Sequence, residues 1–396
     1  MTGDTAIPNH LIDVSEVNVD EFKQLCSRTS AKAEYPLASS IEKNIPIYDL
    51  AKFDPDSSND RIGLQREWNK ALLTGPGVIV LKQMFTPDQY QNVLAAVNGA
   101  FHRIHEKESR ELSHVGDHFD TAGKNKRIWN SLQKHAMEDP DSFIEYYANP
   151  WLGVVSESWL GPGYRITAQV NSVTPGGQAQ RCHADYHLGM QEVEDCKKFP
   201  RSLQNASKHL TLQGAVAHSD MPIESGPTRF LPFSQQYEPG FLAWRHKDFI
   251  SFFDNNYVSL PLQLGDGVFF NPGIFHAAGA NETDPAKGFQ RTANLLQIHC
   301  SFSKAMESID TIPIVSSCWD TLSTKFKGLS DSEISAVIHA AVDAYPYPTN
   351  LDKQPPRADS MMPENEQQLL FRALKLGWAK EQVVQVLEKI QKDSLP

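Results

Sequence analysis

The middle of the chain carries short strand-forming segments that follow one another with turns, and no helix, between them. Residues 164–173 begin this run, and residues 209–217 alternate polar and apolar side chains, as strands with one buried face do. Consecutive short strands favour an antiparallel sandwich or barrel over a parallel sheet, which needs a crossover helix between strands. The sequence therefore predicts a mainly β core. Its other strands are expected at residues 229–231, 258–264, 268–271 and 291–302.

Helical patterns flank this β region on both sides. Apolar residues recur at helical spacing before it, over residues 59–73, 86–106 and 142–160, and after it, over 331–345 and 363–392. Residues 1–58 are polar, and within them only Ile45 to Leu50 resembles a segment that packs. We therefore expect three parts: an N-terminal arm at 1–58, a β domain with N-terminal helices at 59–302, and a C-terminal helical extension at 303–396 packed on the core.

Charge and cysteine content narrow the class of protein. Lys and Arg number 37 against 48 Asp and Glu, a net charge of −11, and no basic cluster is available to displace the counterions of a nucleic acid. The five cysteines are scattered without a C-x-x-C pair, as in a reduced compartment. The chain shows neither a signal-like start nor 18 consecutive apolar residues. We expect a cytoplasmic protein with no nucleic-acid or membrane partner; the sequence leaves its oligomeric state open.

The segment around His183-Ala184-Asp185 predicts half of a metal site. The two side chains lie two residues apart, so on an extended backbone they leave the same face and can bind one ion. A second imidazole, His276, stands at the end of the strand-like run Phe269–Phe275. Two histidines and one carboxylate on one face of an octahedral ion leave three positions open, which is the arrangement of non-haem Fe(II) oxygenases.

Two other histidine groups are alternatives. A second H-x-D, at His218-Ser219-Asp220, also precedes His276 at a plausible distance. The turn Pro175-Gly176-Gly177 and the neighbouring Gln180 favour the first motif, whereas the second runs directly into a Ser-Gly-Pro turn. A cluster between His114 and His118 lies among glycine and charged residues, and we interpret it as a solvated loop.

An iron site of this kind needs a source of electrons to split O2, and 2-oxoglutarate can fill two of the open positions. The far carboxylate of 2-oxoglutarate then needs a fixed cation. Arg291 starts the next strand after His276 and can pair with a carboxylate through two hydrogen bonds. Gln180, three residues before His183, is a further candidate donor to the cosubstrate.

Three stretches of the chain resemble signature segments of the phytanoyl-CoA dioxygenase family: Pro175 to Asp185, Ser219 to Leu231 and Gly265 to His276. The resemblance implies a double-stranded β-helix, also called a jelly roll or cupin-like fold, and a dioxygenase that uses Fe(II), 2-oxoglutarate and O2. It places the iron ligands on His183, Asp185 and His276 and the 2-oxoglutarate arginine on Arg291. The implied reaction hydroxylates a small organic molecule and releases succinate and CO2, with ascorbate as a candidate reductant.

The chain also departs from the family pattern. It reads Pro232-Phe233-Ser234-Gln235 where the family often has P-G-S-H, and residues 281–287 must loop out if Arg291 is to reach the site. Residues 189–208 and 236–257 look like insertions. Because Asp185 fills the position that halide takes in related halogenating enzymes, the resemblance favours hydroxylation over halogenation.

The sequence does not identify the substrate. Candidates for the pocket wall are polar or aromatic residues beside the motif and in the second insertion: Tyr186, His187, Trp244, Arg245 and His246. Two other classes of protein stay open. A cupin-type metal enzyme that does not use 2-oxoglutarate would keep the three ligands without needing Arg291, and a non-catalytic small-molecule-binding protein would need neither.

Overall fold

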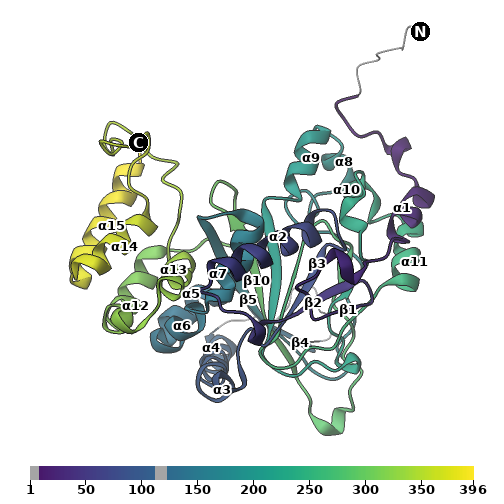
Figure 1. Ribbon diagram of the computed structural model, residues 1–396, viewed down its shortest axis with the longest axis horizontal. Helices are drawn as coiled ribbons and strands as arrows, with labels where there is room; N and C mark the ends of the chain where they lie inside the picture. The colour runs from purple at the N-terminus through teal and green to yellow at the C-terminus, as the bar shows by residue number, and fades with distance from the viewer. Residues whose placement is uncertain (1–8, 112–122) are drawn as a thin grey trace.

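The computed structural model describes residues 9–111 and 123–396, and the cluster between His114 and His118 lies outside this part of the chain. A large sheet runs through the middle of the molecule, with helices against one of its faces (Figure 1). Its strand order is β1-β2-β3-β8-β6-β10-β5-β4. These strands are β1 (Ser40–Glu42), β2 (Ile45–Asp49), β3 (Val78–Lys82), β4 (Asn125–Ile128), β5 (Tyr164–Val173), β6 (Thr211–Ala217), β8 (Gly267–Phe270) and β10 (Arg291–Cys300).

A smaller sheet faces the large one. It consists of β7 (Arg229–Phe230) and β9 (His276–Ala277) and is extended by single bridges from His183 to His276 and from Phe230 to Val258. Buried side chains from both sheets, among them Val80, Val268 and Phe230, form one apolar cluster. The predicted jelly-roll core with flanking helices is confirmed, although helices occupy more of the chain than strands do.

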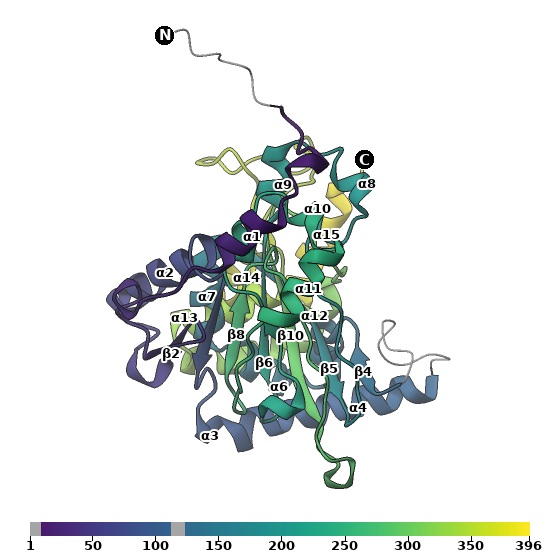
Figure 2. The same ribbon diagram turned by 90° about the vertical axis from the view of Figure 1, so that its right-hand side faces the viewer.

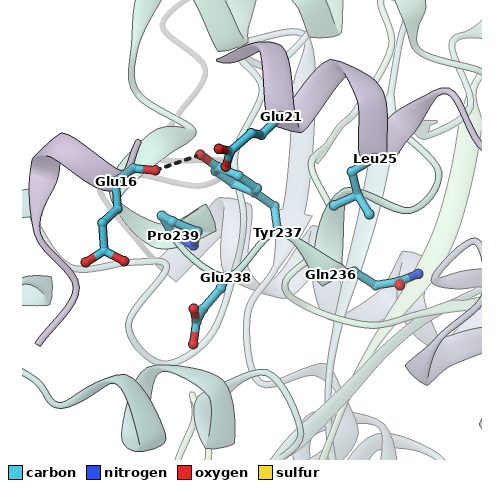
Figure 3. A pocket seen from close by; sticks show the side chains of 7 residues that line it. All are labelled: Glu16, Glu21, Leu25, Gln236, Tyr237, Glu238 and Pro239. Carbon is cyan, nitrogen blue, oxygen red and sulfur yellow. Dashed lines mark hydrogen bonds between the residues drawn. The ribbon is translucent and has the colours of Figure 1, made fainter. Parts of the chain in front are cut away.

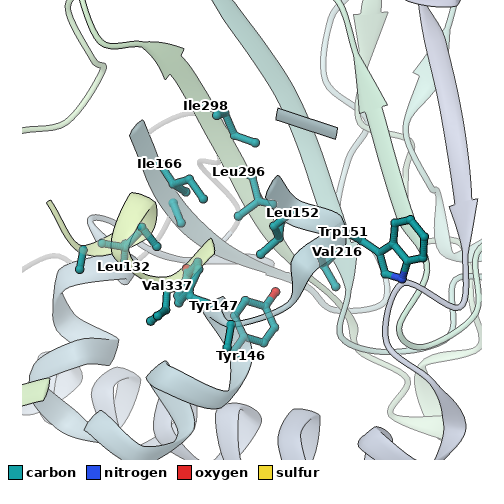
Figure 4. Packing of buried hydrophobic residues seen from close by; sticks show 14 of the residues in the cluster. Leu132, Tyr146, Tyr147, Trp151, Leu152, Ile166, Val216, Leu296, Ile298 and Val337 are labelled. Carbon is teal, nitrogen blue, oxygen red and sulfur yellow. The ribbon is translucent and has the colours of Figure 1, made fainter. Parts of the chain in front are cut away.

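Along each strand, side chains point alternately to the helices outside and to the inside of the jelly roll. β5 and β10 pair along their whole length, from Arg291 opposite Val173 to Cys300 opposite Tyr164. Their outward side chains, Ile166, Leu296 and Ile298, pack against helices in the largest apolar cluster of the described chain (Figure 4). Residues one position along face the inside of the jelly roll, because successive side chains of a strand point to opposite sides.

The helices that cover the outer face come from both ends of the chain. Leu132, Tyr147, Leu152 and Val337 lie in the same cluster as the outward strand residues (Figure 4). The helices on this side of the sheet are α2 (Ser58–Leu73), α3 (Pro87–Gln89), α4 (Ala95–Glu111), α5 (Ser131–Glu138), α6 (Pro140–Tyr147), α7 (Pro150–Leu160), α12 (Thr311–Lys325), α13 (Asp331–Ala341), α14 (Glu366–Leu376) and α15 (Lys380–Ser394). Of these, α12, α14 and α15 pack mainly on other helices and form an outer layer (Figure 1). A π-helical turn at Tyr90–Leu94 joins α3 to α4. No helix among the described residues is long and apolar enough to cross a membrane.

The N-terminal segment is more than the arm that the sequence predicted. Its strands β1 and β2 form a hairpin whose turn residues, Lys43 and Asn44, have positive φ, and β2 pairs in parallel with β3. Residues 40–49 therefore belong to the large sheet. The C-terminal helices share the main core through Trp319, Val337 and Leu369. The division of the chain at residues 58 and 302 stays a prediction.

The two predicted insertions fold into short helices at one end of the jelly roll, where α1 also lies (Figure 2). Phe22 of α1 is fully buried there against Phe249 and Phe275. The hydroxyl of Tyr237 accepts from the Asn18 backbone N–H at 2.7 Å and donates to the Glu16 carbonyl at 3.3 Å (Figure 3). The helices are α1 (Val19–Cys26), α8 (Val193–Cys196), α9 (Arg201–Ser207), α10 (Gly240–Ala243) and α11 (Lys247–Asn256).

Two buried histidines, one on α5 and one directly after β6, predict a pH-dependent stability. His135 and His218 are buried, and desolvation lowers the pKa of each imidazole to about 3. In the unfolded chain each has a pKa of about 6.5, so below that pH the unfolded state binds more protons. The contribution of these two neutral histidines to the free energy of unfolding should be complete above pH ~6.5 and should decrease as the pH falls towards 3. Urea unfolding at a series of pH values measures this.

Replacing His218 with Gln removes one of these two buried imidazoles and leaves the other buried histidines in place. The variant should show a shallower fall in the free energy of unfolding over the same pH range, by about one proton per molecule. An unchanged slope in the variant would contradict the burial of a neutral imidazole at position 218.

Candidate metal centre

Main-chain pairing brings the two parts of the predicted site together. The segment after β5 runs beside β9, so that the His183 and His276 backbones exchange two hydrogen bonds of 2.9 Å. The Gln180 N–H donates to the Ala278 carbonyl at 3.0 Å, and the Asp185 N–H donates to the Pro272 carbonyl at 2.8 Å. His183 and His276 are therefore direct cross-strand neighbours, although 93 positions separate them in the sequence (276 minus 183).

The three side chains converge. The Nε2 atoms of His183 and His276 lie 3.8 and 3.6 Å from Oδ2 of Asp185, and the imidazole centroids are 4.4 Å apart. One ligand atom from each residue falls within 4.8 Å of the other two. This is the convergence that a single ion requires, and it unites the residues that the sequence predicted.

Hydrogen bonds set the tautomer of both histidines. The Nδ1 of His183 is 2.8 Å from the Arg181 carbonyl, and the Nδ1 of His276 is 3.0 Å from the Ile274 carbonyl. A carbonyl only accepts, so each Nδ1 carries the hydrogen and each Nε2 presents its lone pair towards Asp185. Metal-ligating histidines show this pattern, in which the second nitrogen donates to a fixed acceptor.

Asp185 stays ionised in this setting. Burial opposes its ionisation, but His183, His276 and the Gln213 amide outweigh that effect and hold the pKa of the carboxyl well below its usual range. Gln213 extends from β6 of the large sheet, and its Nε2 donates to Oδ2 of Asp185 at 2.8 Å. Burial also lowers the pKa of His183, which favours the neutral imidazole that a metal needs.

Replacing Gln213 with Leu should weaken metal binding without removing a ligand. The substitution deletes the hydrogen bond that orients the Asp185 carboxylate, and loss of such an outer contact typically costs roughly 10- to 100-fold in metal affinity. Titration of the apo-protein with Fe(II) or Co(II) measures the change. Thr211→Val, a polar-to-apolar change two residues away on the same strand, is the control and should bind as the unchanged protein does. Equal affinity in the Gln213 variant would contradict an orienting role.

A cavity of about 740 Å³ opens beside the cluster and is lined by His183 and Asp185. Of the pocket residues suggested by the sequence, Tyr186, Trp244 and Arg245 line it. His187 instead contacts the Lys304 carbonyl, and His246 caps the start of α11, so neither forms part of the wall. The prediction was wrong for these two because each neighbours the cavity in sequence while its side chain is directed elsewhere.

The sequence analysis missed polar residues that the strands contribute to this cavity. Gln169 on β5, Gln297 on β10 and Arg127 on β4 line it, and Arg127 donates to the Gln169 side-chain oxygen at 2.7 Å. Gln169 and Gln297 occupy inward positions of strands whose outward positions are apolar. A polar side chain at an inward position was the signal that could have identified them.

Arg291 lies in the core, close to the glycine-rich turns around the cluster. Its Nη1 donates to the carbonyls of Ser225, Gly226 and Gly279, at 3.0 and 3.1 Å for the first and the last. The two glycines touch one another, and a Cβ on Gly226, whose φ is +74°, would collide with the Ala280 carbonyl. The turns can therefore approach the guanidinium only because they lack side chains.

The Arg291 guanidinium makes no ion pair with a carboxylate of the described residues. Burial lowers its pKa to about 10, so it stays charged at neutral pH. A buried charge without a counter-ion is unfavourable, which fits a site that receives an anionic ligand. Arg291 does not itself line the cavity described above. Gln180 does, and its side-chain oxygen accepts from the Ala278 N–H at 3.2 Å, which leaves the amide hydrogens as the donors it can offer.

The competing H-x-D motif is not part of the cluster. The Nε2 of His218 is 3.0 Å from the Tyr146 hydroxyl, and its Nδ1 is 2.7 Å from the Asn98 side-chain oxygen. The Asp220 carboxylate accepts from the Leu264 backbone N–H at 2.9 Å. Both residues thus serve local packing.

A two-layered, mainly antiparallel β core that brings two histidines and one carboxylate together beside a cavity is typical of mononuclear non-haem iron oxygenases. A family model described as phytanoyl-CoA dioxygenase (PhyH) matches residues 67–289. The chain belongs to this family, and the resemblance of its three sequence segments is confirmed.

Individual proteins and solved structures also resemble this chain, at low sequence identity. The chain is 26% identical over 146 residues to dioxygenase andF from Emericella variicolor, a match that covers 35% of this chain and 45% of that protein. Among solved structures, the non-heme alpha ketoglutarate dependent carbocyclase SnoK from nogalamycin biosynthesis is 18% identical, with a TM-score of 0.43, over 60% of this chain and 84% of that chain. EctD from S. alaskensis, solved with 2-oxoglutarate and 5-hydroxyectoine, is 16% identical, with a TM-score of 0.42, over 63% and 78%.

Proposed function

We propose that this protein is an Fe(II)- and 2-oxoglutarate-dependent dioxygenase that hydroxylates a small organic molecule and releases succinate and CO2. The observation that supports this most strongly is the convergence of His183, Asp185 and His276, with both Nε2 lone pairs directed towards one carboxylate oxygen. Membership of the phytanoyl-CoA dioxygenase family supports the same reaction class. We also propose the cytosol as its compartment, on the scattered free cysteines.

His183, Asp185 and His276 would hold the iron, and the adjoining cavity would admit 2-oxoglutarate and O2. When bound, iron and 2-oxoglutarate supply the oxidising chemistry that converts a C–H bond into C–OH, with O2 as cosubstrate and ascorbate as an external reductant. As a third ligand, Asp185 would leave no place for a halide, which favours hydroxylation over halogenation.

The other residues act by position and charge. Arg291 would pair with the far carboxylate of 2-oxoglutarate. This ion pair would neutralise the buried positive charge, which is otherwise unfavourable. Gln180 lines the cavity, and its side-chain amide would add a hydrogen bond to the cosubstrate. Gln213 keeps the Asp185 carboxylate in one orientation. The cavity walls would exclude water and place one C–H bond of the substrate near the metal.

Two other functions use parts of the same site. A cupin-type metal enzyme without 2-oxoglutarate would need the three ligands but would have no use for a buried guanidinium that lacks a carboxylate. A non-catalytic small-molecule-binding protein would need neither the cluster nor the fixed tautomers. The combination of both features in one chain favours the 2-oxoglutarate-dependent reaction.

Succinate release tests the proposed function. The protein is loaded with Fe(II) and 2-oxoglutarate in the presence of ascorbate and air, and succinate is measured with and without members of a small-molecule library. We expect slow, iron-dependent formation of succinate alone and faster formation with a substrate. An iron-loaded protein that forms no succinate under either condition would overturn the proposal in favour of one of the two alternatives.

A further inference from the structure

The cavity beside the metal cluster gathers positive charge from three distant parts of the chain. Arg127 comes from β4, Arg181 from the segment before His183, and Arg245 from the turn after α10. Among the described residues that line the cavity, Asp185 is the one carboxylate, and it faces the two histidines. Among the described lining residues, guanidinium groups therefore outnumber carboxylates, even though the whole chain is acidic.

Arg245 is held in place while part of its hydrogen-bonding capacity goes unused. Its guanidinium carbon lies 3.8 Å from the centroid of the Trp244 ring, and its Nη1 is buried without an acceptor. Its Nε is 3.9 Å from a carboxylate oxygen of Glu192, whose side chain is 79% exposed. An exposed pair at that distance contributes little, and a buried donor without an acceptor is unfavourable. Burial accordingly lowers the pKa of Arg245.

The rest of the same wall is apolar. Its apolar lining consists of two indole rings and three aliphatic or thioether side chains: Trp129, Trp244, Ile250, Met190 and Met306. The volume of about 740 Å³ lies in the range of cavities that enclose a whole small molecule. Aromatic rings and methionines suit a hydrocarbon or ring system, and methionine adapts to irregular shapes.

We propose that the substrate is an apolar carboxylic acid whose carboxylate pairs with Arg245 and whose hydrocarbon or aromatic body lies against the indole and methionine side chains. The planar guanidinium matches a carboxylate through two parallel hydrogen bonds, and the stacked Trp244 ring fixes its orientation. The claim that this acid is the substrate rests on the proposed function. Its binding at Arg245, in contrast, does not require a metal.

The same charge could attract 2-oxoglutarate, which is also a carboxylate. The two ligands differ in shape: 2-oxoglutarate has no apolar body to cover Trp244, Ile250 and the methionines. The anchor proposed for it, Arg291, lies outside the lining of this cavity. Substitution of Arg245 should therefore leave the binding of 2-oxoglutarate to the iron-loaded protein unchanged.

Calorimetric titration of the metal-free, full-length protein tests the inference. The probes are 1-naphthylacetate and its neutral isostere 1-naphthylacetamide, which differ only in charge and hydrogen bonding. We expect the carboxylate to bind at least roughly tenfold more tightly than the amide, as a charge-assisted hydrogen bond to a buried group implies. Arg245→Gln should remove this preference, and Arg245→Lys should keep part of it.

Lys247→Gln is the matched control. It removes one positive charge two residues further on, at the exposed start of α11 and outside the cavity wall, so the preference for the acid should persist. Circular dichroism and thermal unfolding establish that each variant is folded. Equal binding of acid and amide, binding of neither, or equal loss of preference in the Lys247 variant would each overturn the inference. Because no iron is present, these outcomes are independent of whether 2-oxoglutarate is turned over.

Discussion

Replacing His276 with Ala should abolish turnover and reduce Fe(II) affinity by more than about 100-fold. The side chain is buried, its Nδ1 is fixed by the Ile274 carbonyl, and its Nε2 is one of three convergent ligand atoms. Loss of an outer contact to a ligand already costs roughly 10- to 100-fold, so loss of a ligand itself must cost more. Equilibrium dialysis with Fe(II) under anaerobic conditions measures the affinity.

His218→Gln is the control for this substitution. It changes a histidine of similar burial in the competing H-x-D motif, outside the cluster. The control should bind Fe(II) as the unchanged protein does, even if its free energy of unfolding is lower. If His218→Gln lost iron and His276→Ala retained it, the metal site would have been assigned to the wrong motif.

Replacing Arg291 with Ala should raise the concentration of 2-oxoglutarate needed for half-maximal rate while leaving Fe(II) affinity unchanged. Removing one partner of a buried, hydrogen-bonded charge pair costs about 2–5 kcal/mol, a loss of roughly thirtyfold to several-thousandfold in affinity. Arg291 is not one of the three convergent ligands, and its described hydrogen bonds go to main-chain carbonyls. Steady-state kinetics with varied 2-oxoglutarate measures KM and kcat separately.

The variant also leaves the carbonyls of Ser225, Gly226 and Gly279 without this donor, so its stability must be followed alongside. A merely structural role would lower the fraction of folded protein and kcat together. An anchoring role would raise KM for 2-oxoglutarate, with kcat largely restored at saturation. Arg291→Lys keeps the charge but not the planar fork and should give an intermediate KM. An unchanged KM in Arg291→Ala would exclude Arg291 as the anchor.

The strands that could be predicted best are those with one apolar and one polar face. Residues 164–173 were predicted as a strand and are β5 with the same bounds, and the strand predicted at 291–302 is β10, which ends at Cys300. Residues 258–264 were also predicted as a strand, but they make only isolated bridges, at Val258 and Leu262. Pro261 stands between them and has no N–H to donate, which prevents a continuous ladder.

The N-terminal strands were missed because their partner is distant in sequence. Residues 45–49 are apolar enough to be buried, but the segment is short. It joins the sheet as β2 by pairing with β3, whose residue Val80 lies opposite Ile47. A parallel pairing of this kind is long-range, so local propensity does not reveal it. The helix α12 was overlooked, although its buried residues recur at helical spacing in the sequence: Thr311, Ile314, Val315, Cys318, Trp319 and Leu322.

The metal ligands could be predicted because their chemistry is local. An H-x-D spacing determines which face two side chains share, and the third ligand follows a recognisable strand. The wall of the cavity could not be predicted in the same way. Arg127, Gln169 and Arg245 come from two strands and a turn that meet only in the folded chain, and Arg245 belongs to a segment that the sequence marked only as an insertion.

The central claim is that one ferrous ion, held by His183, Asp185 and His276, binds 2-oxoglutarate through its keto acid group. Anaerobic titration of the Fe(II)-loaded protein with 2-oxoglutarate tests it most directly, because a keto acid that chelates such an iron gives a weak visible charge-transfer band. We predict a band that saturates at one equivalent per chain and is absent from His276→Ala. Stoichiometric Fe(II) binding with no band on addition of 2-oxoglutarate would contradict the account.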